Sequence, residues 1–222
     1  MQKLVQGLHQ FQKRIFSSHR ELFERLEKGQ TPETLFITCS DSRIDPNLIT
    51  QTEPGDLFIL RNVGNLVPRY QDHIGSAAAA IEFAVTALHV KEIILCGHSN
   101  CGAMQAVMDP SSIERLPAMQ AWMSHAAETG RLVRENYAHL EGEARFAATV
   151  EENVLVQLEN LRTHPSVAAA LEQGALRVHG WLYKIQTGEV FAYDAEQAQF
   201  MPLSEAGVQP LDASHRSSEL SI

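Results

Sequence analysis

The stretch TLFITCSDSR, residues 34–43, decides how this chain is interpreted, because an apolar run ends there in a thiol, a carboxylate and a guanidinium. Residues 34–38 have the β-branched and aromatic composition of a short buried strand. Cys39, Asp41 and Arg43 follow this strand at alternate positions. Serine and aspartate are ordinary turn residues, but the combination with a cysteine and an arginine points to chemistry at the end of the strand.

A second strand ends in residues of a similar kind. The run EIILCG, residues 92–97, is apolar on both faces, as central strands of parallel sheets are, and His98 and Cys101 follow it. Between the two strands, residues 75–89 predict a mostly apolar, buried helix with Ser76 as its N-cap. This order of strand, helix and strand predicts βαβ units and a doubly wound, mostly parallel sheet.

The remaining segments complete an α/β fold. Residues 56–60 (DLFIL) predict another strand, and residues 144–162 predict a helix. Residues 177–194 predict two strands joined at Thr187–Gly188, which form an antiparallel addition to one edge of the sheet. We therefore expect a single α/β domain with a mostly parallel central sheet, flanking helices, this antiparallel edge and an N-terminal helical arm.

The 222 residues suit one domain of ordinary size. We expect residues 1–201 to form it, with residues 1–29 as the helical arm and residues 202–222 as a loosely ordered tail. Apolar side chains recur along the arm at helical spacing. They pack either on their own domain or on a second subunit, and the sequence favours neither.

Composition excludes several function classes. The formal net charge of −9 argues against nucleic acid and anionic membrane surfaces as partners. No run reaches the roughly 18 apolar residues of a membrane span, and the amphipathic start is not a secretory signal. Three cysteines in a chain expected to be cytoplasmic favour a metal site or a reactive thiol over a disulfide framework.

The soft ligands of the chain predict a metal site. If the two strands are neighbours, Cys39 meets His98 and Cys101 beyond their carboxyl ends, where open parallel sheets bind ligands. Two thiolates and one imidazole match a catalytic zinc site with an open fourth position. In the alternative interpretations, both cysteines are buried apolar side chains beside a loop histidine, or they form a disulfide. Cys96, inside the strand, is expected to be a packed core thiol.

Asp41 and Arg43 then acquire a role. The planar guanidinium can hold the carboxylate through two hydrogen bonds, which keeps Asp41 off the metal and leaves room for water. Zinc lowers the pKa of its water, and Asp41 can accept the proton of the zinc-bound hydroxide in a hydrogen bond. The alternative is an exposed salt bridge worth about 0–1 kcal/mol.

With these motifs the chain resembles the β-class carbonic anhydrases, closest to their cyanobacterial carboxysomal-type branch. The resemblance rests on CSDSR at residues 39–43, GHSNCG at 97–102, LRNVGNLVP at 60–68 and AAIEFAV at 79–85. It covers roughly residues 22–194. It implies a lyase, carbonate dehydratase, that hydrates carbon dioxide reversibly to bicarbonate and a proton.

The resemblance also implies a division of roles. Zinc would be held by Cys39, His98 and Cys101, with Asp41 and Arg43 as the gate. The protein would be a homodimer or a higher homo-oligomer, with N-terminal helices that embrace the neighbouring subunit and active sites at the dimer interface.

A substrate pocket is implied in the same way. Gln30 matches a pocket glutamine, Phe58 and Val63 match apolar pocket positions, and Gly102 matches a backbone donor to the substrate. Apolar walls suit carbon dioxide, and an amide can polarise one of its oxygens. Phe83 departs from the plant-type members, which have a tyrosine there.

Three further expectations concern state, proton transfer and location. Phe36 stands where the bacterial members with an inhibitory bicarbonate site have tryptophan, so we expect the active arrangement, with Asp41 paired to Arg43. Tyr70 and His73 are candidates for a proton shuttle. The expected location is the cytoplasm; the alternative is the carboxysome, with its components as partners.

Two rival functions keep the same zinc site. One is hydrolysis of carbonyl sulfide or carbon disulfide, which some members of this family carry out. The other is a zinc-binding carboxysome assembly protein without catalytic activity. A merely structural zinc ion needs no gate, so Asp41 and Arg43 argue against the second. A thiol-redox enzyme is disfavoured because the chain has no Cys-x-x-Cys motif.

Overall fold

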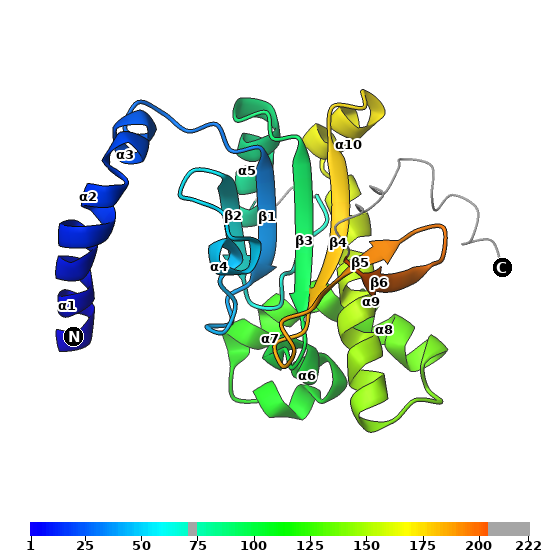
Figure 1. Cartoon of the computed structure of the whole chain (residues 1–222). Coiled ribbons are helices and arrows are strands. Elements are labelled where there is room, and N and C mark those ends of the chain that lie inside the picture. Colours follow the sequence, from blue (N-terminus) through cyan, green and yellow to red (C-terminus); the bar gives the residue numbers. More distant parts are fainter. Residues whose placement is uncertain (71–74, 204–222) are drawn as a thin grey trace. The chain divides into compact units, whose positions relative to one another are not determined.

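The computed structural model describes residues 1–70 and 75–203 (Figure 1). The chain divides into two compact units, Met1–Thr31 and Pro32–Ile222. The predicted shuttle residue His73 and residues 204–222 of the predicted tail lie outside the described residues.

The first unit is helical, which confirms the predicted arm. Its elements are α1 (Gln2–Gln10), the π-helical turn η1 (Phe11–Ile15), α2 (Phe16–Ser18) and α3 (Arg20–Leu26). Phe16 and Phe23 stack with ring centroids 5.0 Å apart, and Phe11 packs edge-on against Phe23. Leu4 and Leu8 remain exposed in this unit, so part of its apolar stripe is uncovered.

A six-stranded sheet organises the second unit, in the order β2-β1-β3-β4-β5-β6. The strands are β1 (Thr34–Cys39), β2 (Leu57–Asn62), β3 (Glu92–His98), β4 (Arg177–Tyr183), β5 (Val190–Asp194) and β6 (Gln199–Pro202). The first four in spatial order are parallel, and β5 and β6 pair antiparallel. The predicted mostly parallel sheet with an antiparallel edge is confirmed.

Two details of the sheet differ from the sequence-based expectation. The antiparallel addition begins only at β5, because β4 pairs in parallel with β3. Strand β6 was not predicted, and it extends to Pro202, the expected start of the tail. Phe200 packs on Tyr193 of β5 with ring centroids 5.4 Å apart, a cross-strand contact that helps to hold β6 in place.

The helices of the second unit lie around this sheet (Figure 1). They are α4 (Pro46–Thr50), α5 (Ser76–Glu82) with η2 (Phe83–Ala87), α6 (Gly102–Met108), η3 (Pro110–Ile113), α7 (Pro117–Met123), η4 (Ser124–Ala126), α8 (Ala127–Asn136), α9 (Gly142–Arg162) and α10 (Pro165–Glu172). In the part of the chain that the structure describes, no helix combines the length and the apolarity that a membrane crossing needs.

Helix α5 is less buried than its composition suggested. Only one face of it is covered, at Ala77, Ile81 and the following Ala84. Ser76 is the first helical residue rather than the N-cap, a position taken by Gly75. One face of the alanine run is therefore buried and the other is exposed, although the residue types on the two faces are nearly the same.

One face of the sheet carries the main core and is covered by α5, α9 and α10. Two glycines allow α9 to approach it closely. A Cβ at Gly97 would lie 2.7 Å from Val154 Cγ2, and one at Gly180 would lie 2.8 Å from Leu158 Cδ1. Helix α9 therefore lies directly against β3 near its carboxyl end and against the middle of β4.

The opposite face holds a smaller apolar cluster of Phe36, Ile94 and Cys96 with Trp181 packed against it. Cys96 is 1% exposed, and burial raises the pKa of its thiol to about 12. The prediction that Cys96 is a packed core thiol is confirmed.

Candidate metal centre

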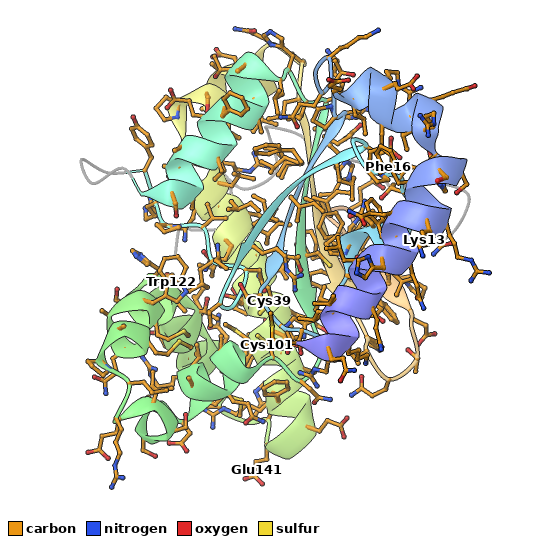
Figure 2. The ribbon with its side chains drawn as sticks, turned by 90° about the vertical axis from the view of Figure 1, so that its left-hand side faces the viewer. Lys13, Phe16, Cys39, Cys101, Trp122 and Glu141 are labelled. Carbon is orange, nitrogen blue, oxygen red and sulfur yellow. The ribbon has the colours of Figure 1, made fainter. Side chains whose placement is uncertain are left out.

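Three soft donors meet where two neighbouring strands end. Cys39 is the last residue of β1, His98 is the last residue of β3, and Cys101 directly precedes α6. Because β1 and β3 pair in parallel, their carboxyl ends share one edge of the sheet. The ligand atoms of all three residues are buried and lie within 4.8 Å of one another. Figure 2 shows Cys39 next to Cys101 at this edge.

The histidine is set up as a neutral ligand. Its Nδ1 lies 2.9 Å from the carbonyl oxygen of Ser99. A carbonyl only accepts hydrogen bonds, so Nδ1 is the nitrogen that donates, and in the neutral tautomer that this contact favours Nε2 keeps its lone pair. Nε2 is buried and finds no hydrogen-bond partner among the described residues. An imidazole held through one nitrogen, with the other free toward two thiols, fits a bound metal ion.

The two thiols are electrostatically unequal, and neither is in a disulfide. A hydrogen bond from the Cys101 thiol, with a second one from the Gly64 amide, holds the pKa of Cys39 well below its usual range, although burial acts in the opposite direction. The same hydrogen bond and burial raise the pKa of Cys101. If a cation binds both sulfurs as thiolates, the proton of Cys101 must leave when it binds.

Asp41 lies beside this cluster and is held by Arg43. Arg43 donates from Nε to Asp41 Oδ1 at 2.9 Å and from Nη2 to Oδ2 at 2.6 Å. These hydrogen bonds hold the pKa of Asp41 well below its usual range. Asp41 Oδ2 lies 3.9 Å from His98 Nε2, so the carboxylate faces the three donors. Arg43 Nη2 also donates to the Asn100 carbonyl at 3.0 Å, which ties the pair to the loop that carries His98 and Cys101.

Arg61 and Asn62, part of the LRNVGNLVP motif, shape the segment around Cys39. Arg61 donates from Nε to the Cys39 carbonyl at 3.0 Å and from Nη2 to the Asp41 carbonyl at 2.7 Å. The Asn62 side chain bonds both the N–H and the C=O of Leu66, at 2.7 and 2.8 Å. These contacts close the loop after β2 over Cys39.

The predicted pocket residues fall into two places. Val63 and Gly102 adjoin the cluster, because Val63 precedes the Gly64 amide that donates to Cys39 Sγ and Gly102 follows Cys101. Phe58 pairs with Leu35, four residues before the end of β1, which is about 13 Å along the strand. It packs instead against Phe83, with ring centroids 5.9 Å apart.

The remaining predicted residues keep the status of predictions. Gln30 belongs to the unit Met1–Thr31. Tyr70 is exposed, and its ring packs edge-on against His164 at 5.6 Å. Neither observation tests a role in substrate binding or proton transfer.

Two contacts at this centre escaped sequence analysis. The Trp122 indole N–H donates to the Val63 carbonyl at 2.7 Å, and Asn153 donates from Nδ2 to the Gly64 carbonyl at 3.1 Å. Both donors are distant in sequence from the loop that they hold, and no local pattern marks them.

Comparison with known proteins agrees with this geometry. Residues 34–190 match the family model described as carbonic anhydrase. A carbonic anhydrase of Synechocystis sp. is 51% identical over 202 residues, which cover 90% of this chain and 74% of the relative.

Solved structures give the same result. The structure of the β-carbonic anhydrase CcaA superposes with a TM-score of 0.90 at 50% identity, over 92% of each chain. A structure described as one of two tetrameric β-carbonic anhydrases from Sordaria macrospora gives a TM-score of 0.78 at 28% identity, over 86% of this chain and 95% of that one. On the sequence match, the fold and the three converging donors, this chain belongs to the β-class carbonic anhydrase family of lyases.

Proposed function

We propose that this chain is a zinc-dependent carbonic anhydrase that hydrates carbon dioxide reversibly to bicarbonate and a proton. The observation that carries the proposal is the buried set of Cys39, His98 and Cys101, whose ligand atoms lie within 4.8 Å of one another beside an arginine-held carboxylate. Membership of the family supports the reaction class.

The three residues suit zinc in number and in kind. Two thiolates and one imidazole form the Cys₂His set that holds catalytic zinc, which leaves a fourth position for water or substrate. A bound zinc ion supplies Lewis acidity, which makes water a nucleophile near neutral pH. His98 needs no tautomer change to bind, because Ser99 already fixes its proton on Nδ1.

Asp41 is proposed to act as an ionised hydrogen-bond acceptor beside the ligands. Arg43 engages both of its oxygens, which opposes a direct bond between the carboxylate and a metal ion. From this position Asp41 accepts a hydrogen bond from the attacking water and directs the water's lone pair toward the substrate carbon. We infer that the peptide amide of Gly102, the first residue of α6 and the neighbour of Cys101, binds a substrate oxygen.

We further propose that the active form is a homo-oligomer. Phe58 lies far along its strand from the metal donors of its own chain, so a pocket role for it requires a second copy. The exposed Leu4 and Leu8 of the arm suit burial against such a copy. The Sordaria macrospora relatives are described as tetrameric, which supports assembly. The three unpaired cysteines fit a reducing cytoplasm.

The test combines metal analysis with kinetics on one preparation. We expect about one zinc ion per chain, as the three-donor site requires, and carbon dioxide hydration in stopped flow that exceeds turnover of carbonyl sulfide or carbon disulfide. Asp41→Ala should keep its zinc and lose about 100-fold or more in turnover. A wild-type protein without zinc would refute the proposal, and near-wild-type rates for Asp41→Ala would refute the gate alone.

A further inference from the structure

One peptide unit links the first metal ligand to a helix that carries no ligand. The N–H of Gly64 donates to Cys39 Sγ at 3.3 Å. The carbonyl of the same peptide, that of Val63, accepts from the Trp122 indole N–H at 2.7 Å. Because the N–H and C=O of a trans peptide point in opposite directions, the three groups form a continuous chain from Trp122 through the peptide to the sulfur.

Trp122 is fixed on the far side of this peptide. It lies on α7 (Pro117–Met123) and packs against the apolar cluster that contains Cys39, Leu66 and Cys101. Its ring meets that of His125 edge-on at 5.1 Å. In Figure 2, Trp122 lies on helix α7, which is a different segment from the strand β1 that ends in Cys39.

The loop has little freedom to turn the Gly64 amide elsewhere. Gly64 adopts a left-handed backbone at φ +83°, and the Ala103 Cβ lies only 2.8 Å from where a Cβ of this residue would stand. Its own carbonyl is held by Asn153 Nδ2 at 3.1 Å. The peptide between Val63 and Gly64 is thus anchored from α7, and the next peptide is anchored from α9.

We propose that Trp122 is a positioning residue that fixes the Gly64 amide against Cys39 Sγ and thereby strengthens zinc binding at this site. The inference rests on the proposed zinc site. The N–H donor holds the Cys39 sulfur in place at 3.3 Å, and polarisation along a hydrogen-bonded chain strengthens the last bond. Mutation of a residue that orients a metal ligand typically lowers metal affinity or activity by 10–100-fold.

The direct test is Trp122→Phe, which keeps an aromatic ring and removes the N–H donor. We expect its zinc affinity, measured by competition with a chromophoric chelator, to fall about tenfold. Trp181→Phe is the matched control. The Trp181 Nε1 is buried, and within residues 1–70 and 75–203 it has no hydrogen-bond partner. The same ring replacement there should leave zinc affinity unchanged.

Cobalt substitution gives a readout that packing changes alone would not move. A thiolate that loses a hydrogen-bond donor has higher-energy lone pairs, so the thiolate-to-cobalt charge-transfer band of Trp122→Phe should shift to longer wavelength. That of Trp181→Phe should not shift. Unchanged zinc affinity and an unchanged band in Trp122→Phe overturn the inference, as does an equal loss of affinity in both variants.

If Trp122→Phe fails to fold, the two hydrogen bonds can be tested in the wild-type protein. A crystal structure of the zinc-loaded wild type must then keep Trp122 Nε1 and Val63 O, and Gly64 N and Cys39 Sγ, within hydrogen-bond distance; if either bond is broken, the inference is wrong. A wild type that binds no zinc overturns the proposed function, whereas a zinc-binding wild type matched by Trp122→Phe overturns only the role of Trp122.

Discussion

Replacement of Gly64 by alanine isolates the geometry that the loop after β2 imposes on the site. The backbone of Gly64 is left-handed, with φ +83°, and a Cβ there would lie 2.8 Å from the Ala103 Cβ and 3.5 Å from Leu66 Cγ. Ala103 lies in the first turn of α6, and its methyl group is fixed to the helix backbone. The loop or the helix must therefore move.

Two costs follow from these numbers. A left-handed backbone costs an L-residue about 1–2 kcal/mol, and overpacking of a rigid contact costs about 1–3 kcal/mol. Together they predict that Gly64→Ala lowers the free energy of unfolding by about 2–5 kcal/mol. The displaced Gly64 amide should also weaken its hydrogen bond to Cys39 Sγ and reduce zinc affinity.

Gly188→Ala separates the two costs. Gly188 has a similar φ of +75°, but a Cβ there meets nothing within 4 Å in the described chain. Gly188→Ala should lower the free energy of unfolding only by the backbone cost, about 1–2 kcal/mol, and its zinc affinity should stay unchanged. Urea unfolding of both variants and wild type at equal protein concentration provides the comparison. Equal destabilisation in the two variants, with zinc affinity intact in both, would contradict the reasoning from the Ala103 contact.

Three further changes test other parts of the account. Cys101→Ser should lose most of its zinc by elemental analysis, because a hydroxyl of ordinary pKa replaces a thiolate poorly; stoichiometric zinc in this variant would remove Cys101 from the ligand set. Arg43→Lys should keep zinc but lower carbon dioxide hydration about tenfold, since an ammonium cannot engage both Asp41 oxygens; an unchanged rate in stopped flow would show that the two-point contact is unimportant. Burial lowers the pKa of His164 in the folded chain below its ordinary value of 6.5. As the pH falls below 6.5, the imidazole is therefore protonated in the unfolded chain before it is protonated in the folded chain, and the free energy of unfolding decreases. His164→Asn should reduce the difference between urea midpoints at about pH 7.5 and about pH 5.5, and an unchanged difference would exclude His164 as its source.

The meeting of the three donors could be predicted because their placement follows from strand order and direction alone. Cys39 and His98 end parallel strands, and Cys101 follows within three residues, so neighbouring strands are sufficient to bring them together. The bidentate contact of Asp41 and Arg43 was predictable for a local reason, because the two opposite charges are two residues apart and a guanidinium fork matches a carboxylate.

The supporting contacts depend on side chains that meet only in three dimensions. Trp122 and Val63 are 59 residues apart, and Asn153 and Gly64 are 89 apart, so no local spacing marks either pair. Strand β6 was missed because its four residues end in proline and are mostly uncovered, and its pairing with β5 decides its conformation. The one-sided burial of α5 was missed because an alanine run has little hydrophobic contrast around the helix.

The central claim is that two thiolates and one imidazole of this chain hold a zinc ion and leave one position for water or substrate. X-ray absorption at the zinc edge of the purified wild type measures this directly. The account predicts two sulfur neighbours at about 2.3 Å and light-atom neighbours at about 2.0–2.1 Å, one of them from His98 and one from solvent. Any zinc that stays bound in Cys39→Ser or Cys101→Ser should have fewer sulfur neighbours than in the wild type. A protein that binds no zinc, or a zinc shell without sulfur, would contradict the account.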